Sequence, residues 1–390
     1  MTARVRHPWR NWRWLMMAAS VTGTSVLAGC SASRGPGAAA PPAPTGTASL
    51  ATSMTTATGA TWAVVAMGGS AAGANQFWEL FARAAASDRW ELLTPPGVAS
   101  NGGLVAAGGP ASLSVAFRPS QGLTFSPLAV TSDAGKTWHT GLIEAPVASD
   151  PDALAAGAGA MLALLGDGTV EQSGTAGASW TRLAVPGAIA SSAAGRRCQV
   201  TSLTAVAYAP SGTPLAAASC TRPGIAGIFA RSDNTWQAAG PVLGGALAAR
   251  QVTVLRLTGT VAGDIALLRA GAGGDASLLA AWTSDGTRWT VSAPLAAGTG
   301  QVAASGTGSG GAAWLLLADG RAYAVSGPGG AWRRLPSPPP GTAALAAGPG
   351  GAFEALAAAG GNLTVYQLSP AGHWGKAQAL TVPIQYGSSS

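Results

Sequence analysis

The chain has 390 residues, of which 9% are charged, and it contains 56 glycines and 14 tryptophans. Its formal net charge of +7 overstates its basicity, because four arginines belong to the first 13 residues and the other 18 basic residues nearly balance 15 acidic ones. These charges are scattered, which excludes the concentrated basic face that a nucleic-acid-binding protein needs. No run of about 18 apolar residues follows residue 30, which excludes a later transmembrane helix.

The first 30 residues have the parts of a secretory signal. A basic n-region with four arginines is followed by an apolar h-region at residues 14–27 and then by small residues. The letters LAGC at residues 27–30 resemble the lipobox of bacterial lipoproteins. This resemblance implies that residues 1–29 are a signal peptide cut off by a dedicated peptidase, and that Cys30 becomes an N-terminus carrying a diacylglycerol and further acyl chains such as palmitate. An ordinary secretory signal and an uncleaved anchor are the alternatives.

Residues 30–58 consist almost entirely of Ser, Ala, Pro, Gly and Thr after the cysteine. Such a segment lacks the bulky apolar side chains that offset the entropy of ordering, so we expect a flexible linker. Each buried CH₂ of an acyl chain contributes about 0.8 kcal/mol, so several chains on Cys30 would hold the protein at a membrane. The sequence therefore predicts an extracytoplasmic, lipid-anchored protein of the cell membrane whose body spans residues 59–386.

The body repeats a short motif that ends in tryptophan. Successive copies are 48, 42, 56, 53, 43 and 42 residues apart and end at Trp90, Trp138, Trp180, Trp236, Trp289, Trp332 and Trp374. Repeats of this length are typical of propellers and solenoids. Each unit contains four short apolar runs with Gly- or Pro-containing turns, and no long segment has helical periodicity. We therefore predict an all-β β-propeller of four-stranded blades, seven in number, with six or eight as alternatives because propellers often share strands between chain ends.

The motif resembles the Asp-box, or bacterial neuraminidase repeat, of pattern Ser-x-Asp-x-Gly-x-Thr-Trp. One copy is matched by Ser132, Asp133, Gly135, Thr137 and Trp138, a second by Asp285 and Trp289 with its glycine shifted, and a third by Asp233 and Trp236 without the glycine. The resemblance implies turns on the outer rim of the fold, away from the axis where ligands bind. In such a turn the Asp and Ser side chains accept backbone hydrogen bonds, Gly allows a positive φ, and Trp supplies apolar area. The motif is therefore interpreted as structural.

Cys198 and Cys220 are the two cysteines that follow the leader. The segment between them predicts a hairpin with its turn near PSGT at residues 210–213, which brings the two cysteines roughly side by side. An exported protein meets an oxidising compartment, so an even pair favours a disulfide. A metal site is disfavoured because it would need more ligands than these cysteines and the distant histidines supply.

Sialidases are the best-known enzymes with this repeat, and they need three arginines, a Tyr–Glu pair and an Asp acid. Arg118 matches only part of their arginine motif, and none of the five glutamates lies in a recognisable catalytic context. Asp167 and Asp319 recur in matching surroundings, but an Asp-Gly pair between apolar runs is a hairpin signal that explains both. His139 and His373 are too few for a catalytic triad or a histidine metal site. We predict no catalytic residue, metal or cofactor.

These features favour a binding or assembly protein at the cell surface. Propellers present loops around a central axis, which suits an envelope protein, a peptide or a glycan as the partner. The alternative is a sialidase-like or other glycoside hydrolase, since one fold hosts many functions.

Overall fold

The computed structural model describes residues 48–381, apart from gaps at 58–59, 68–76, 85–86, 96–102, 108–111, 118–124, 145–150, 158, 175–176, 178, 297, 299, 309–310, 349–351 and 360–361. The chain separates into two compact units, Met1–Pro42 and Ala43–Ser390, and every described residue belongs to the second. Cys30 and Arg118 lie outside the described residues. No helix in the described part of the chain is both long and apolar enough to cross a membrane.

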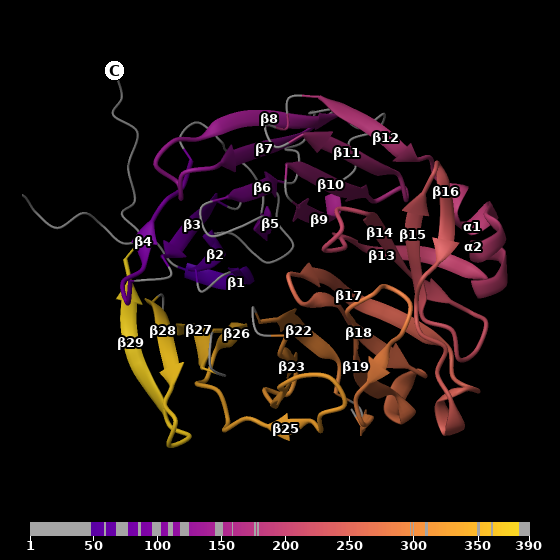
Figure 1. The fold of residues 1–390 in the computed structure, drawn as a ribbon. Coiled ribbons are helices and arrows are strands. Elements are labelled where there is room, and N and C mark those ends of the chain that lie inside the picture. The colour runs from indigo at the N-terminus through magenta and orange to yellow at the C-terminus, as the bar shows by residue number, and fades with distance from the viewer. Residues whose placement is uncertain are drawn as a thin grey trace, which may run out of the picture. The chain divides into compact units, whose positions relative to one another are not determined.

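The described strands form consecutive four-stranded antiparallel units, the blades, arranged around a common centre (Figure 1). The first three blades contain β1 (Ala48–Ala57), β2 (Ala60–Met67), β3 (Phe77–Arg83) and β4 (Glu91–Leu92); β5 (Gly103–Ala107), β6 (Leu113–Phe117), β7 (Phe125–Thr131) and β8 (His139–Glu144); and β9 (Pro151–Gly157), β10 (Ala160–Leu165), β11 (Val170–Gly174) and β12 (Trp180–Ala184). Within each of these blades, neighbours in sequence are neighbours in the sheet.

Blades 4 and 5 belong to one nine-stranded sheet, because β14 pairs with β17 as well as with β13 and β15. Their strands are β13 (Val200–Tyr208), β14 (Pro214–Cys220), β15 (Gly227–Ser232) and β16 (Thr235–Ala238), then β17 (Val252–Thr260), β18 (Gly263–Ala270), β19 (Ser277–Thr283), β20 (Thr290–Val291) and the extra strand β21 (Leu295–Ala296). Two 3-10 turns, η1 (Gly245–Leu247) and η2 (Gly273–Asp275), lie in the connections.

Blades 6 and 7 complete the ring. They contain β22 (Val302–Thr307), β23 (Ala313–Leu317), β24 (Ala322–Val325) and β25 (Arg333–Arg334), then β26 (Thr342–Ala347), β27 (Phe353–Ala359), β28 (Asn362–Leu368) and β29 (Trp374–Leu380). The first strand of every blade contacts the first strands of its two neighbours, and β1 contacts β26. The seven-bladed prediction is confirmed, and no strand is shared between the chain ends in the described part.

The first strand lies inside the segment 30–58 that the sequence assigns to a linker. β1 (Ala48–Ala57) pairs with β2, so the propeller begins at least eleven residues before the predicted start at 59. The composition of this strand is misleading because a β-ladder is made by backbone groups, which Ser, Thr and Ala supply as well as bulky residues do. The predicted linker is thereby shortened at its C-terminal end.

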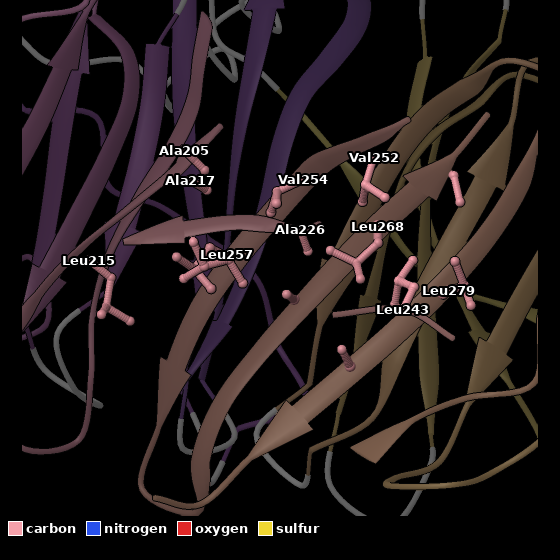
Figure 2. Packing of buried hydrophobic residues seen from close by; sticks show 14 of the residues in the cluster. Ala205, Leu215, Ala217, Ala226, Leu243, Val252, Val254, Leu257, Leu268 and Leu279 are labelled. Carbon is pink, nitrogen blue, oxygen red and sulfur yellow. The ribbon is translucent and has the colours of Figure 1, made fainter. Parts of the chain in front are cut away.

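Buried apolar side chains of the described residues gather in seven clusters, each between two adjacent blades. Figure 2 shows the cluster between blades 4 and 5, where Leu215 and Ala217 pack with Leu257 and Leu268. Each cluster also includes or contacts one tryptophan of the repeated motif, which belongs to the later of the two blades: Trp138, Trp180, Trp236, Trp289, Trp332, Trp374 and, across the closure, Trp90. The motif tryptophan therefore joins two blades rather than covering only its own hairpin.

Two of these tryptophans also donate a hydrogen bond to the preceding blade. The Nε1 of Trp289 donates to the Ala239 carbonyl at 2.6 Å, and the Nε1 of Trp374 donates to the Pro336 carbonyl at 3.1 Å. In both cases the acceptor follows the last strand of the preceding blade. The equivalent Nε1 of Trp332 is buried without a partner among the described residues, so the apolar contact, and not the hydrogen bond, is common to the motif.

The turn before Trp138 has the geometry of an Asp-box, with one reassigned residue. The Asp133 carboxylate accepts hydrogen bonds from the Thr137 N–H at 2.9 Å, the Thr137 hydroxyl at 2.6 Å and the Thr131 hydroxyl at 2.8 Å. These donors lower the pKa of Asp133 to about 2. Gly135 has a φ of 86°. The prediction for Ser132 is wrong: Ser132 is exposed, and Thr131 fills the hydroxyl position by also accepting from the Gly135 N–H.

The other two predicted copies differ from each other. In blade 5, Asp285 accepts from the Thr287 and Arg288 N–H groups, both at 2.8 Å, and from the Thr283 hydroxyl, so it repeats the Asp133 arrangement. In blade 4, Asp233 and Asn234 have φ values of 45° and 68° between paired residues of β15 and β16. This is the geometry of a two-residue type I′ hairpin turn. A short loop without glycine adopts this turn in place of the Asp-box turn.

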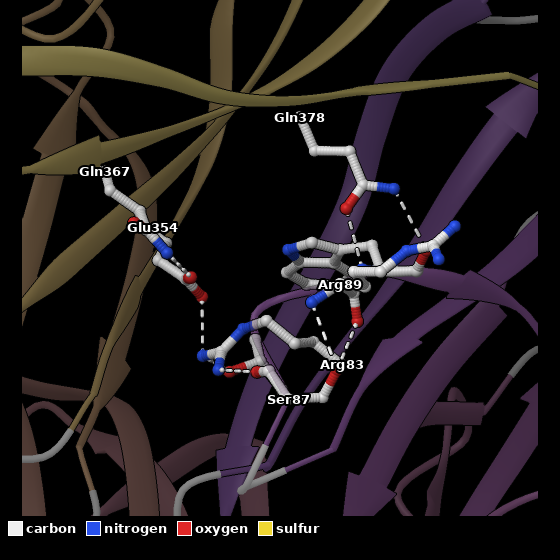
Figure 3. A network of polar contacts seen from close by, with 8 residues as sticks. Arg83, Ser87, Arg89, Glu354, Gln367 and Gln378 are labelled. Carbon is white, nitrogen blue, oxygen red and sulfur yellow. Dashed lines mark hydrogen bonds and ion pairs between the residues drawn. The ribbon is translucent and has the colours of Figure 1, made fainter.

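Blades 1 and 7 close the ring without a covalent link (Figure 3). The Arg83 Nη2 lies 3.0 Å from the Glu354 Oε2, and both side chains are largely buried, with 12% and 7% exposed. The other carboxylate oxygen of Glu354 accepts from Gln367 at 3.0 Å. Gln378 of blade 7 accepts from the Trp90 N–H at 2.8 Å and donates to the Trp90 carbonyl at 3.0 Å. Polar pairing therefore supplements the apolar cluster at this junction.

Candidate functional site

A ligand clamp near the axis of a propeller would be built from the innermost strands. Among the described residues of β1, β5, β9, β13, β17, β22 and β26, the ionisable side chains are Asp152, Tyr208 and Arg256. The Tyr208 hydroxyl accepts from Gln172 at 2.9 Å, and burial raises its pKa. A sialidase uses a clamp of three arginines and a Tyr–Glu pair. The described parts of these strands supply one arginine and one tyrosine, and the tyrosine is paired with an amide.

The recurring aspartates Asp167 and Asp319 lie in turns, as predicted. Asp167 accepts from the Thr169 N–H at 2.8 Å in the β10–β11 turn, and Asp319 accepts from the Arg321 N–H at 3.0 Å in the β23–β24 turn. No group of three His, Cys, Asp or Glu side chains in the described part of the chain could hold a metal ion. These two aspartates therefore stabilise turns within blades.

The connection from blade 3 to blade 4 carries two short helices, α1 (Ala188–Ser191) and α2 (Ala193–Cys198). Ser192 caps α2: its hydroxyl accepts from the Gly195 N–H at 3.0 Å and donates to the Ile189 carbonyl at 2.7 Å. A Cβ on Gly195 would lie 1.9 Å from the Ile189 carbonyl oxygen, so only glycine allows this tight corner. Helices of four and six residues are too short to give a periodic apolar pattern in the sequence. The 56-residue spacing between Trp180 and Trp236, the longest between motif tryptophans, is the sequence signal of this insert.

A disulfide fixes the end of α2 to the blade. Cys198 and Cys220 are joined, with their Cα atoms 5.3 Å apart, as the predicted hairpin requires. Beside the disulfide, the Arg222 N–H donates to the Cys198 carbonyl at 3.2 Å. A Cβ on Gly227 would approach the two sulfur atoms to 2.6 and 3.0 Å, so this glycine leaves room for the bridge. The insert is consequently held by covalent, polar and steric constraints.

Between this insert and β16 runs a groove of about 630 Å³, which we call the β16 groove. Its lining residues are Leu183, Ala188, Ser192, Ala193, Ala194, Arg197, Asn234, Thr235, Trp236, Gln237 and Ala238. Trp236, with 7% of its surface exposed, and Ala194 provide apolar surface. Figure 1 shows α1 and α2 beside β16. The groove therefore follows the whole outermost strand of blade 4.

Arg231 links the two sides of the groove through hydrogen bonds. Its guanidinium donates to the Leu183 carbonyl and to the Asn234 side-chain oxygen, the latter at 2.8 Å. The same group lies 5.8 Å from the Trp236 ring centroid, a cation–π distance. Arg231 is thus occupied by the protein itself. Arg197 is the charged residue that lines the groove, and its exposed side chain is available to a ligand.

The groove also exposes the edge of a sheet. β16 pairs with β15 alone, in the register Ser232↔Thr235 and Arg231↔Trp236. In an antiparallel pair the backbone N–H and C=O groups of successive residues point alternately toward and away from the partner strand. Where the groups of Thr235 and Gln237 point toward β15, those of Trp236 and Ala238 therefore point to the outer edge. Among the described strands, β16 has no second partner on its outer side. The arrangement suits an added strand.

The end of α2 carries basic side chains. Arg196 and Arg197 occupy the last turn of α2, and Arg222 follows the disulfide partner Cys220 after one residue. All three side chains are exposed. Of the three, Arg197 lines the groove, so its positive charge favours a negatively charged extended ligand.

Solved structures of other propellers resemble this fold. The GH74 xyloglucanase from Xanthomonas campestris is 14% identical with a TM-score of 0.54, over 83% of this chain and 52% of that one, so this chain spans about half of that enzyme's length. A protein from Lactobacillus plantarum is 12% identical with a TM-score of 0.54, over 82% and 96% of the two chains. YCF48 from Cyanidioschyzon merolae is 14% identical with a TM-score of 0.47, over 87% and 97%.

The first two likenesses show the shared β-propeller fold and nothing about activity. No protein-family model and no curated protein matches the sequence.

Proposed function

We propose that the protein is a lipid-anchored, extracytoplasmic binding protein whose propeller holds an extended, acidic segment of a partner polypeptide in the β16 groove. The observation that carries this proposal is the open edge of β16 beside a groove lined by Arg197. Backbone groups of an edge strand supply affinity for any extended chain, and neighbouring side chains supply selectivity. The positive charge of Arg197 supplies the preference for carboxylates.

Two segments of the chain itself are poor candidates for this groove. Residues 31–47 carry one basic and no acidic residue, and residues 382–390 carry no charged residue. Neither segment has an acidic side chain to pair with Arg197. Side-chain charge therefore favours a separate acidic polypeptide over these two segments.

The first test is the binding of a defined probe to the purified protein. An acetylated, amidated octapeptide of alternating Glu and Val is expected to bind saturably in fluorescence anisotropy, and its Lys–Val counterpart to bind at least tenfold more weakly. Arg197→Ala is expected to weaken the acidic peptide about tenfold, as loss of a charge-assisted hydrogen bond does. Ala238→Pro should weaken it further, because proline removes an outward N–H from the edge.

The matched control is Arg333→Ala, which removes an exposed arginine from β25 in blade 6. It should leave the affinity unchanged. Equal binding of the acidic and basic peptides, or an affinity that Arg197→Ala leaves intact, would contradict the proposed site.

The anchoring part of the proposal rests on the LAGC sequence and has its own test. Cys30→Ala is expected to abolish metabolic labelling with a palmitate analogue and to leave the protein unprocessed or released from the membrane fraction, because no thiol remains to be acylated. The Cys198→Ser and Cys220→Ser double variant should keep its label. Unchanged labelling of Cys30→Ala would refute the lipoprotein assignment.

A further inference from the structure

The two ends of the blades lie on two different faces of the ring. Consecutive strands of each blade run antiparallel, so the turn between the second and third strands lies at the same end as the connections between blades. The first strands contact one another around the ring (Figure 1), so these ends share one face, which we call the entry face. β1 begins on this face at Ala48. The other two turns of each blade lie on the opposite face.

On blades 4 and 5, four segments of the entry face are bonded to one another. The Arg222 N–H donates to the Cys198 carbonyl at 3.2 Å, and the Gly224 N–H donates to the Arg250 carbonyl at 2.8 Å. The Arg250 guanidinium in turn donates to the Asp275 carbonyl at 3.2 Å. The segments joined in this way are residues 185–199, 221–226, 239–251 and 271–276. They form one continuous surface across the two blades.

This surface carries an excess of positive charge. Its four segments contain one acidic residue, Asp275, and the basic residues Arg196, Arg197, Arg222 and Arg250. Arg269 adds a fifth arginine, since it lies one residue before the end of β18 and pairs with Thr253 near the start of β17. All but Arg250 are exposed, and no ion pair among the described residues involves any of the five. The fold therefore gathers charges that are scattered in the sequence.

The opposite face has no such excess. Its described turns between third and fourth strands contain more aspartates than basic residues: Asp88, Asp133, Asp233 and Asp285 against Arg89, Lys136 and Arg288. Elsewhere on the entry face, the turns between second and third strands carry Asp167 and the paired Asp319 and Arg321. The described part of the propeller is therefore polar in charge, with its positive side on the entry face of blades 4 and 5.

Two exposed valines lie on the same face as these arginines. Val242 is 78% exposed, and its bridge to Ile225 places it beside the turn that carries Arg222. Val185 is 50% exposed and lies just before α1. At a membrane surface an apolar side chain enters the acyl boundary while neighbouring arginines meet the headgroup phosphates. The valines favour a lipid surface over a soluble polyanion, which offers no apolar layer.

We propose that the entry face of blades 4 and 5 docks on a bilayer of anionic phospholipid, with Arg222 and Arg269 on the headgroups and Val242 at the acyl boundary. The orientation rests on the lipid anchor of the proposed function. Cys30 precedes Ala48 by 18 residues, and a coil of that length spans about 23 Å on average. The opposite face lies a strand length, about 30 Å, farther from the start of β1. The anchor therefore favours the entry face as the side toward the bilayer.

The test uses a chain that begins at residue 31 and so cannot be acylated. It contains the whole compact unit Ala43–Ser390, to which every described strand belongs. In co-sedimentation it is expected to bind vesicles of phosphatidylcholine with about 30% phosphatidylglycerol, and to bind vesicles of phosphatidylcholine alone at least about tenfold more weakly. Raising NaCl from about 0.1 to about 0.5 M should release it, because salt screens the headgroup charge.

The variants remove charge or apolar area from the entry face alone. Each arginine contributes about fivefold to partition onto an anionic surface, so Arg222→Gln with Arg269→Gln should weaken vesicle binding at least about tenfold. Val242→Ser should weaken it about threefold through lost apolar burial.

The matched controls come from the opposite face. Lys136→Gln with Arg288→Gln removes the same charge, and Val261→Ser changes a turn valine that is 96% exposed. Both should bind the vesicles like the wild type.

Three results would overturn the proposed docking face. They are no binding of the wild type to the phosphatidylglycerol vesicles, equal losses in the two charge pairs, and saturable binding of polyglutamate without vesicle binding, which would assign the face to an acidic polymer. The test leaves Arg197 in place and does not use Cys30, so its failure is distinguishable from failure of the peptide groove or of the acylation.

Discussion

Replacing Arg83 with methionine is expected to lower the free energy of unfolding by about 3–4 kcal/mol, measured by urea denaturation at pH 7. Arg83 pairs with Glu354 across the junction of blades 1 and 7, and both side chains are largely buried. The same guanidinium also donates to the Ser87 carbonyl at 3.1 Å and the Thr61 hydroxyl at 3.3 Å. Methionine keeps the apolar stem but leaves the Glu354 carboxylate charged and without its cation.

Two further variants separate the ion pair from simple damage to the core. Adding Glu354→Gln to Arg83→Met should restore at least 1 kcal/mol, because the buried charge is removed while the bond to Gln367 can remain. Arg321→Met breaks an exposed pair with Asp319 and should lower the free energy of unfolding far less than Arg83→Met does. If the Arg83 and Arg321 variants lose equal stability, the closing pair does not have the role assigned to it.

The repeated tryptophan explains why the fold could be predicted from the sequence. A propeller blade has no stable core of its own, so each interface needs a large apolar side chain at a fixed place in the repeat. Trp138 and Trp289 fulfil this requirement from equivalent turns. Their spacing in the sequence therefore reports the number of blades directly, even where the rest of the Asp-box has been lost.

The details of the turns were predicted less well than the fold. The Ser-x-Asp spacing of the motif puts its hydroxyl residue two positions before the aspartate, which is Thr131 before Asp133 and not Ser132. The same position holds Thr283 before Asp285 but Arg231 before Asp233. The turn at Asp233 therefore lacks this hydroxyl as well as the glycine, and its shorter loop forms a type I′ turn.

The candidate site could not be predicted, since it depends on residues distant in sequence. The β16 groove requires α2 and β16 to lie side by side, which the disulfide at Cys198 and the hairpin enforce together. The disulfide itself was predictable because its hairpin is local.

Asp264 provides the second large effect, and it has the opposite sign to that of Arg83. The side chain is 3% exposed, and its Oδ1 has no hydrogen-bond partner among the described residues. Burial raises its pKa from 3.8 to about 6. The folded state therefore binds this proton more tightly than the unfolded state does, so the contribution of Asp264 to stability is highest below pH 4, falls between pH 4 and 6, and stays reduced above that range.

Replacing Asp264 with asparagine is accordingly expected to stabilise the protein at pH 7 by about 2 kcal/mol, a value reduced to allow for solvent screening. The gain should vanish at pH 4, where the wild-type carboxyl is already neutral. Asp319→Asn is the control, because Arg321 lowers the pKa of Asp319 and removal of that charge should weaken the protein at pH 7. Urea titrations of the three proteins at pH 4 and 7 measure both signs. A gain for Asp264→Asn that is equal at the two pH values would come from packing and not from the ionised carboxylate.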